Sequence, residues 1–510
     1  MPTTSVHDLK TLILSFHAVI AIETLEEQRV ADLLQVVARE TGLRFYDWTI
    51  TQGLVRRPEG QAGEAIANSS GPLELLNSIA AGAGQGNSSQ GNSSQGNSGT
   101  GIFLLKDFGK HLKDPTVIRK LRELSQRFSQ TPSALVITGS SLELSDELEA
   151  VYYTLEMPTR DELYEMLQAV VRSLNTQQKI KIDLDAQALG EILKALQGMT
   201  LNQARQIIAY AALTDNRLSR EDIEDIQARK IKFLQEGGLL EYYPPQDNSS
   251  EIGGFSNLKA WVKRAQVGFS AEAQSLNLTP PKGILIVGVQ GCGKSLAAKI
   301  IARDWQLPLL KLDAGRLYDK YVGESEKNLR RATAMAAAMA PAVLWLDELE
   351  KGFSPPSESN DGGTSQRMFG TFLTWLQEKK EAVFVVATAN DLSKLPPELM
   401  RKGRFDEIFF VDLPDAAARK VIFEIHLDRR KQDSSQFDLQ LLVNQSAGFS
   451  GAEIEQAVVA ALYRALHLNL PLNTAILQEE VNSTVPLSVS CREDIEALRA
   501  FAQERFVSAE

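Results

Sequence analysis

Residues 288–295 read Gly-Val-Gln-Gly-Cys-Gly-Lys-Ser, between the apolar run 284–287 and the helix-like stretch 296–302. Glycines let the backbone curl until successive amides point at phosphate oxygens, and the start of the following helix adds the positive end of its dipole. Strand, loop and helix in this order therefore predict a phosphate-binding loop rather than a glycine-rich turn. We expect Lys294 to reach the β and γ phosphates of a nucleotide, and Ser295 to hold Mg²⁺.

The composition is that of a globular chain that lacks the marks of several other classes. Its 510 residues predict about two to four domains. The net charge of -11 and the pI near 5.3 argue against a nucleic-acid partner, because binding phosphate backbones needs concentrated Lys and Arg. Two cysteines and five scattered histidines give neither a disulfide framework nor a metal-ligand spacing. Every apolar run is shorter than the about 18 residues of a membrane span, so none is expected.

Polar side chains follow two further apolar runs. Residues 342–346 suit a buried parallel strand, and Asp347 and Glu348 come directly after it. Asp347 can organise the shell of a magnesium ion, while Glu348 can polarise an attacking water. Strand 383–387 is followed at Asn390 by a neutral amide, which can hydrogen-bond the water or the γ-phosphate. These parts predict hydrolysis of a nucleotide at one edge of a sheet.

Two arginines, Arg401 and Arg404, lie on the short loop segment 399–406. The planar, permanently charged guanidinium suits stabilisation of charge on transferring phosphoryl oxygens. The alternative for each arginine is a surface salt bridge.

In this order, the phosphate loop, Asp347-Glu348, Asn390 and the arginine segment resemble the AAA family of ring-forming ATPases, from about residue 252 onward. The resemblance implies an α/β fold: an AAA+ P-loop NTPase core, in which helices flank a parallel sheet, followed by a helical lid. It implies ATP and Mg²⁺ as cofactors. It also makes Asn390 a sensor of the γ-phosphate, and Arg401 and Arg404 fingers donated to the nucleotide of the neighbouring subunit.

The resemblance assigns binding residues outside the loop as well. The turn at 252–254 and His426 match positions that touch adenine or ribose in the family, although His426 could instead be an ordinary packed histidine. Residues 448–454 resemble the lid-helix motif, where Gly451 and Ala452 would let the helix start approach the nucleotide. The expected nucleotide contacts are Gly253, Gly288, Val289, Gln290, Gly291, Cys292, Gly293, Lys294, Ser295, Leu296, His426, Gly451 and Ala452.

The sequence departs from the family pattern at two positions. Leu349-Glu350 stands where an acidic pair usually follows, and Lys402 stands where a proline is common. Neither position touches the chemistry directly, but by the resemblance both sit where neighbouring subunits would communicate, so the departures bear on ring cooperativity more than on hydrolysis. Cys292 lies beside a helix start that can lower its pKa, which allows either a redox-sensitive thiol or a simple small filler.

Residues 320–326, Lys-Tyr-Val-Gly-Glu-Ser-Glu, resemble the pore loop of AAA unfoldases. An aromatic ring followed by a β-branched residue can grip an extended polypeptide whatever its sequence, so Tyr321 and Val322 are the expected gripping residues. The alternative is that Tyr321 packs against its own subunit.

The first half of the chain shows a weak repeat of the second. Residues 38–40 align with residues 302–304 at an offset of 264 (302 less 38), and strand 18–22 then matches the strand before the phosphate loop. In place of the loop stand residues 24–31, Thr-Leu-Glu-Glu-Gln-Arg-Val-Ala, which bring two carboxylates and no glycine. We expect both the geometry and the charge to abolish phosphate binding there.

Later landmarks recur with changed spacing. Residues 102–108 match the Asp347-Glu348 strand with Phe108 at the position of the catalytic carboxylate, and residues 134–140 match the sensor strand and end in Ser140. The repeat predicts a degenerate AAA-like α/β domain ahead of the ATPase core. The alternative is an unrelated α/β domain with the same alternation of strands and helices.

The predicted domain plan has four parts. A degenerate AAA-like domain without a phosphate loop covers 1–215, with a flexible Gly-, Asn- and Ser-rich loop at 82–101. A linker at 216–250 leads to the AAA+ ATPase core at 251–414, and a helical lid with a C-terminal helix covers 415–510.

Over nearly its whole length the chain resembles AAA ATPases found in cyanobacteria and encoded in algal plastid genomes. The resemblance implies a bacterial cytoplasm or a plastid stroma in a phototroph, and a regulatory role in photosynthesis. The leading hypothesis is a homo-oligomeric ring, a hexamer, that hydrolyses Mg-ATP and remodels a protein partner. The alternative is a nucleotide-dependent switch or scaffold that recruits partners without threading them. A nucleic-acid motor is a third possibility, which the acidic charge disfavours.

Overall fold

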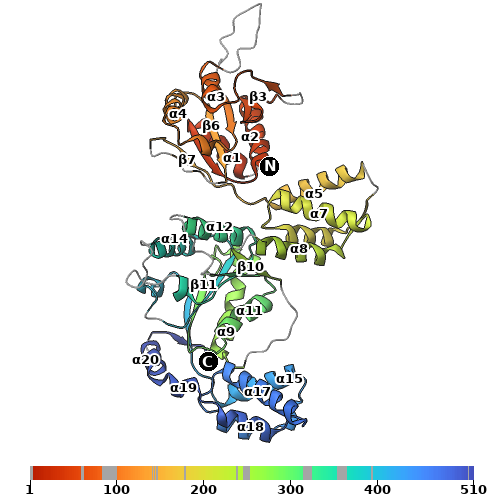
Figure 1. The fold of residues 1–510 in the computed structure, drawn as a ribbon, viewed down its shortest axis with the longest axis vertical. Helices are drawn as coiled ribbons and strands as arrows, with labels where there is room; N and C mark the ends of the chain where they lie inside the picture. The colour runs from red at the N-terminus through yellow and green to blue at the C-terminus, as the bar shows by residue number, and fades with distance from the viewer. Residues whose placement is uncertain are drawn as a thin grey trace, which may run out of the picture. The chain divides into compact units, whose positions relative to one another are not determined.

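The computed structural model describes the chain except for residues 1–3, 59–62, 83–99, 141, 143, 145–146, 177–179, 237–238, 245–252, 314–323, 353–363, 392–393, 402 and 504. The described residues form two compact units, Met1–Lys181 with Met199–Arg217, and Ile182–Gly198 with Leu218–Glu510 (Figure 1). Tyr321, Val322, Lys402 and most of the predicted loop 82–101 lie outside the described residues. The predicted domain boundaries stay predictions.

The first unit contains a seven-stranded sheet. Its strands, in order across the sheet, are β4 (Glu64–Ala65), β3 (Gly53–Arg56), β2 (Arg44–Thr49), β5 (Gly101–Leu105), β6 (Ala134–Gly139), β1 (Val19–Glu23) and β7 (Val151–Tyr152). Strands β2, β5, β6, β1 and β7 run parallel to one another, and β3 and β4 add an antiparallel edge beside β2. Alternate residues of β1 enter two different apolar clusters, one on each face, so the sheet is buried on both sides.

Helices surround this sheet and continue into a helical segment. They are α1 (Thr4–Leu14), α2 (Glu27–Thr41), α3 (Pro72–Ala80), η1 (Phe108–His111), α4 (Pro115–Phe128), α5 (Arg160–Asn175) and α7 (Leu201–Asp215). Thr159 with Glu162 and Thr200 with Gln203 form capping boxes that fix the starts of α5 and α7.

The second unit contains another seven-stranded sheet. Its strands, in order, are β10 (Leu240–Tyr243), β12 (Leu309–Leu312), β13 (Ala342–Leu346), β14 (Val383–Ala389), β11 (Gly283–Gly288), β15 (Glu407–Val411) and β16 (Val507–Ser508). Only β10 pairs antiparallel among the described strands of this sheet. The carboxyl ends of the parallel strands therefore meet at one edge, where α/β folds bind their ligands.

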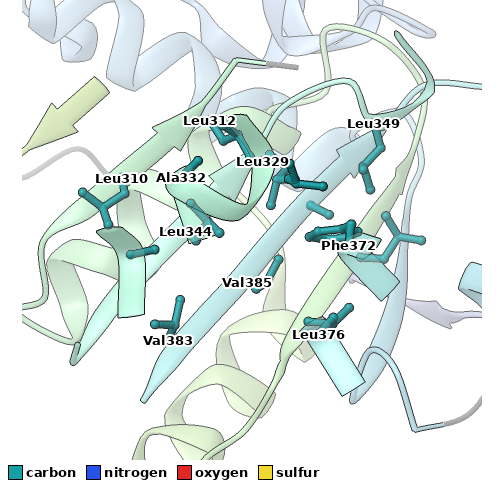
Figure 2. Close-up of a cluster of buried hydrophobic side chains, with 14 of the residues drawn as sticks. Leu310, Leu312, Leu329, Ala332, Leu344, Leu349, Phe372, Leu376, Val383 and Val385 are labelled. Carbon is teal, nitrogen blue, oxygen red and sulfur yellow. The ribbon is translucent and has the colours of Figure 1, made fainter. Parts of the chain in front are cut away.

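Helices cover both faces of this second sheet. On one face, α12 (Glu324–Ala338) and α14 (Thr364–Glu378) pack on side chains such as Leu344 and Val385, which Figure 2 shows in one apolar cluster. On the other face, α9 (Ser256–Ala265) and α11 (Lys294–Asp304) pack on the alternate residues of the same strands. Two-sided burial explains why the predicted strands are continuously apolar.

Four helices after the sheet form the predicted lid. They are α15 (Ala416–Arg429), α16 (Leu439–Gln445), α17 (Gly451–Leu468) and α18 (Thr474–Ser483), and they share a separate apolar core.

After the lid, the chain returns to the sheet through α19 (Leu487–Ser490), α20 (Arg492–Ala502) and β16. Leu498, Phe501 and Phe506 pack against the core of the sheet rather than against the lid.

The remaining described elements of the chain are short or lie between these parts. They are α6 (Ala186–Leu196), α8 (Asp222–Glu236), α10 (Ala271–Ser275), α13 (Leu349–Gly352), η2 (Gln266–Phe269), η4 (Pro397–Met400), η5 (Ser434–Gln436), β8 (Lys181–Asp183) and β9 (Arg217–Ser219).

The two sheets share one strand order. Counted along the chain, the five parallel strands of the first sheet and the first five parallel strands of the second lie in the order second, third, fourth, first, fifth, and the second sheet adds β16 beside the fifth. Ile22 pairs with Thr138 as Ile286 pairs with Thr388, which keeps the predicted offset of 264 (286 less 22). The predicted fold class, two related α/β parts and a helical lid, is confirmed.

One predicted match in the first unit is wrong by a residue. The end of β5 has the same register as the end of β13, which places Asp107 rather than Phe108 at the position of Glu348. Asp107 and Glu348 share left-handed backbone, with φ of 54° and 52°. Phe108 is buried, as Leu349 is. The sequence could not fix this alignment, because two continuously apolar runs match equally well in hydropathy when one is shifted by a residue.

Candidate nucleotide site

A cavity of about 570 Å³ opens at the carboxyl edge of the second sheet, beneath the start of α17. Fourteen of the predicted site residues line it: Gly253, Gln290, Gly291, Cys292, Gly293, Lys294, Ser295, Leu296, Asp347, Glu348, Asn390, His426, Gly451 and Ala452. Gly288, Val289, Arg401 and Arg404 do not line it. Its volume lies within the range of about 300 to 1,000 Å³ that small-molecule pockets occupy.

The loop between β11 and α11 has the curled backbone that the sequence predicted. Gly291 and Gly293 have left-handed φ of 77° and 85°, which glycine adopts without a steric cost. At Gly288 a Cβ would lie 1.9 Å from Val411 O on the neighbouring strand, so only glycine fits. The backbone N–H of Ala452 donates to Gly291 O over 3.0 Å and joins the loop to the lid.

Lys294 is buried at the start of α11. Its Nζ donates to Gly288 O and Val289 O, each over 2.8 Å, so these two loop residues hold the ammonium although they do not line the cavity. Burial lowers the pKa of Lys294 to about 8, and the nearby acidic side chains oppose that shift only in part. An anion placed beside Lys294 would therefore stabilise the charged form of its ammonium.

Ser295, Asp347 and Thr388 form a chain of short hydrogen bonds. Ser295 Oγ donates to Asp347 Oδ1 over 2.9 Å, and Thr388 Oγ1 donates to the same oxygen over 2.6 Å. Thr388 Oγ1 also accepts from Glu348 N over 3.1 Å, which supports the left-handed backbone of Glu348. The start of α11 and the ends of β13 and β14 thus fix one carboxylate between two hydroxyls.

Glu348 and Asn390 face each other across the sheet edge. Asn390 Nδ2 donates to Glu348 Oε1 over 3.3 Å, and Asn390 N donates to Glu350 Oε1 over 3.0 Å. Glu350 is buried and bonded within its own chain. The expected part of Glu350 in communication between subunits stays a prediction; within its own chain the side chain reaches the sensor strand.

His426 lies at the rim of the cavity on α15. Its Nδ1 accepts from Arg430 Nη1 over 3.3 Å and lies 3.6 Å from Glu455 Oε1. Burial lowers the pKa of His426, Arg430 and Arg429 act in the same direction, and Glu455 opposes them. The imidazole is therefore held neutral beside the cavity, with Nε2 as its donor.

Cys292 does not have the lowered pKa that its place before a helix suggested. Burial raises the pKa of its thiol to about 12, and the opposing effect of Lys294 is smaller. The thiol stays protonated at neutral pH, so the reactive-thiolate hypothesis is wrong in its premise.

The two arginines lie away from the cavity of their own chain. Arg401 is exposed, and Arg404 Nη1 donates to Glu398 O over 2.9 Å. Lys282 Nζ donates to Gly403 O over 2.9 Å and ties their loop to the base of β11.

The cavity also has lining residues that no sequence motif indicated, among them Thr388, Phe255, Glu455 and the segment 508–510. Thr388 gave a signal, since it lies two positions before Asn390 at the end of a predicted strand. The others lie on separate elements, and no local pattern relates them to the loop.

In the first unit, the place of the phosphate loop is filled by an ion-pair network. Arg29 is buried and its guanidinium donates to both carboxylate oxygens of Glu162 and, over 2.6 Å, to Glu156 O. Glu26 lies 3.4 Å from Arg29 and accepts from Leu201 N, at the start of α7, over 2.8 Å. Buried side chains of this chain thus occupy the position where the second unit has its cavity.

The parallel sheet, the glycine loop on a helix start and the acidic strand end define the class of P-loop nucleoside triphosphatases. The sequence model of the "ATPase family associated with various cellular activities (AAA)" matches residues 284–413. The models of the N-terminal and second domains of SpoVK-like AAA ATPases match residues 5–157 and 161–237.

Relatives match almost the whole chain. The AAA domain-containing proteins ycf46 of Guillardia theta and Pyropia yezoensis are 37% and 35% identical to it over 503 and 500 residues. These matches cover 98% and 97% of this chain and 94% and 97% of the two relatives. The human ATPase family gene 2 protein homolog A is 33% identical over 236 residues, 44% of this chain and 26% of that protein. The chain belongs to the AAA family of ATPases, and the predicted likeness to those of algal plastids is confirmed.

Proposed function

We propose that the chain is a Mg-ATP-dependent ATPase that works in a hexameric ring and remodels a protein partner. The observation that carries the proposal is the convergence of Lys294, Ser295, Asp347, Glu348 and Asn390 on one cavity. Membership of an ATPase family supports ATP as the nucleotide, and the residues that line the cavity support a separate role for each side chain.

The donor set of the cavity fits Mg²⁺. Ser295 Oγ and Asp347 Oδ1 are hard oxygen donors 2.9 Å apart. Within the described ranges there is no group of three or more His, Cys, Asp and Glu that could hold a metal. That suits an ion which takes one or two protein oxygens and completes its shell with phosphate and water. Bound Mg-ATP would supply the reactive phosphoanhydride and its charge neutralisation.

The chain's own groups have separable roles in this proposal. Lys294 and the amides of the loop bind phosphate oxygens, and the start of α11 adds its dipole. Glu348 accepts the proton of the attacking water, and Asn390, whose Nδ2 donates to Glu348 Oε1 over 3.3 Å, orients that carboxylate and the water. His426, Gly253 and the lid residues Gly451 and Ala452 hold the base and ribose end.

Arg401 and Arg404 supply the argument for assembly. Neither lines the cavity of its own chain, and Arg401 is exposed. An arginine finger is worth about 10³- to 10⁵-fold in turnover, so a site without one is slow. A ring in which each subunit offers its arginines to the next satisfies this need.

Mixing two inactive variants tests the ring. Glu348→Gln keeps the arginines and Arg404→Ala keeps the carboxylate, so we expect each alone to be inactive in phosphate release and an equal mixture to regain activity. Arg492→Ala, at an exposed arginine of α20, is the control and should leave turnover unchanged. If the mixture stays as inactive as its parts, the arginine does not act between subunits.

Remodelling rests on the pore-loop resemblance of Tyr321 and Val322, whose segment lies outside the described residues. We expect an unfolded protein such as casein to stimulate turnover, and Tyr321→Ala to remove the stimulation without lowering basal turnover. Tight ATP binding with negligible turnover, and no effect of casein, would favour the switch or scaffold instead. Negative-stain imaging with and without ATP would show whether rings form.

The setting is also a proposal. The structure has no helix, among the residues it describes, that is long and apolar enough to span a bilayer. Because the relatives come from algal plastids, we propose a plastid stroma or a bacterial cytoplasm, and a regulatory role in photosynthesis. Recovery of the protein with the membrane fraction of lysed cells would contradict that location.

A further inference from the structure

The last residues of the chain return to the nucleotide cavity after the lid is complete. Strand β16 pairs parallel with β15, and Phe410 O accepts from Ala509 N over 2.9 Å. Ser508, Ala509 and Glu510 line the cavity. This segment, residues 507–510, therefore forms part of the cavity wall although it is far in sequence from every predicted site residue.

The segment caps helix α9 at its start. Phe255 is the N-cap residue of α9 and its side chain makes no capping hydrogen bond. Ala509 O accepts from Asn257 N and Leu258 N over 3.1 and 3.2 Å, which satisfies two of the N–H groups that a helix start leaves free. Glu510 Oε1 accepts from Phe255 N over 3.1 Å, and a carboxylate at this end of a helix is also favoured by the helix dipole.

The turn before α9, residues 253–255, has a backbone conformation that is unfavourable without supporting contacts. Phe255 has a left-handed φ of 63°, which costs energy for an aromatic residue. Its ring lies against the phosphate loop, 3.6 Å from where a Cβ on Gly293 would be. Gly254 touches the segment so closely that a Cβ would lie 1.9 Å from Glu510 Oε1, and a Cβ on Gly253 would lie 3.0 Å from Ala418 O. The turn is thus clamped between the segment, the loop and helix α15.

The segment is anchored on the sheet as well. Arg499 of α20 pairs with Asp412 over 2.8 Å, and Asp412 itself lines the cavity. Phe501 and Phe506 pack against the sheet core and against each other, with ring centroids 6.0 Å apart. These contacts hold residues 507–510 beside the turn.

We propose that Glu510 is a positioning residue for nucleotide binding: through the N–H of Phe255 it fixes the turn 253–255 against the phosphate loop. The inference rests on the proposed function, that this cavity binds Mg-ATP. Glu510 acts through the turn and touches no group assigned to hydrolysis. Its loss should therefore weaken binding and leave the chemical step intact.

The test compares Glu510→Ala with Glu510→Gln in the full chain. Glutamine keeps an oxygen that accepts from Phe255 N, whereas alanine removes it. We expect Glu510→Ala to raise KM and the Kd for Mg-ATP about tenfold with kcat within about twofold, and Glu510→Gln to stay close to the parent. Glu496→Ala, at an exposed carboxylate of α20, is the control and should change neither constant.

A second variant guards against a folding defect. Asn257 Nδ2 donates to Ser508 O over 3.2 Å and to Glu510 O, so Asn257→Ala should raise KM in the same way. Unchanged KM in both alanine variants, or a fall in kcat at constant KM, would overturn the inference. If Glu510→Gln weakens binding as much as Glu510→Ala, the hydrogen bond is not the cause and the inference also fails. A parent protein that binds no Mg-ATP would instead overturn the proposed function on which it rests.

Discussion

Replacing Arg29 by methionine should loosen the first unit strongly, because Arg29 is the centre of a buried network. Its side chain is 4% exposed, and its partners Glu26 and Glu162 are 10% and 12% exposed. Glu162 comes from α5 and Glu26 also accepts from the start of α7, so the network joins the start of α2 to both helices. Methionine fills a similar volume but leaves both carboxylates without their cation.

The size of the effect follows from burial. Removing one partner of a buried ion pair costs about 3 to 5 kcal/mol, because the remaining charge is left in a medium of low polarity. Substituting both partners costs less than the sum of the single changes. We therefore expect Arg29→Met with Glu162→Gln to show a coupling energy of about 1 to 3 kcal/mol. Glutamine keeps the oxygen that accepts from Thr159 N in the capping box of α5.

Hydrogen exchange followed by mass spectrometry is the assay, since it reports on each helix and needs no global two-state transition. In Arg29→Met the amides of α5 and α7 should exchange faster by about two to three orders of magnitude. The matched control is Arg119→Met on α4, which removes an exposed ion pair with Glu123 and should leave exchange unchanged. If Arg29→Met behaves like Arg119→Met, the network does not hold α5 and α7 to the start of α2.

Three further predictions concern the second unit. Thr388→Val should lower kcat about 10- to 100-fold by freeing Glu348 and Asp347, while Thr388→Ser, which keeps the hydroxyl, should not; equal kcat in both variants would contradict this. Because Lys294 has a pKa of about 8 and phosphate favours its charged form, affinity for ATP should be nearly steady below pH 7 and fall about fivefold from pH 8 to pH 9. Calorimetry in two buffers should show proton uptake on binding in this range. A flat pH profile would refute that role of Lys294. Burial raises the pKa of Cys292 to about 12, so at pH 8 iodoacetamide should alkylate it at least about a hundredfold more slowly than it alkylates glutathione; mass spectrometry showing comparable rates would contradict this.

Much of the fold could be read from the sequence because its signals are local. The continuously apolar runs at 284–287, 342–346 and 383–387 predicted strands buried on both faces, and the sheet has them so. The repeat at offset 264 predicted the matching first strands of both sheets. At the end of β5 the sequence offered only an apolar run to align, and the alignment was wrong by one residue. Phe108 was matched to Glu348, whereas the strand register matches Asp107 to Glu348.

The candidate site divides in the same way. The loop at 288–295 and the carboxylates Asp347 and Glu348 lie on one cavity as expected, because a strand end and the turn after it are set by neighbouring residues. The environment of Cys292 was misjudged, since its pKa depends on how deeply the folded chain buries the thiol rather than on its place before a helix. The bond from Asn390 N to Glu350, forty positions away, is another contact that no local pattern indicates.

The order of strands and helices, the curled phosphate loop and the acidic strand end follow from local sequence, because each depends on residues within a few positions of one another. Contacts between residues far apart in the chain depend on the tertiary fold. Arg29 bonds to Glu162, 133 positions away in the sequence, and Phe255 bonds to Glu510, 255 positions away. Such pairs depend on the path by which the chain returns to the sheet, which no local pattern of hydropathy or charge encodes.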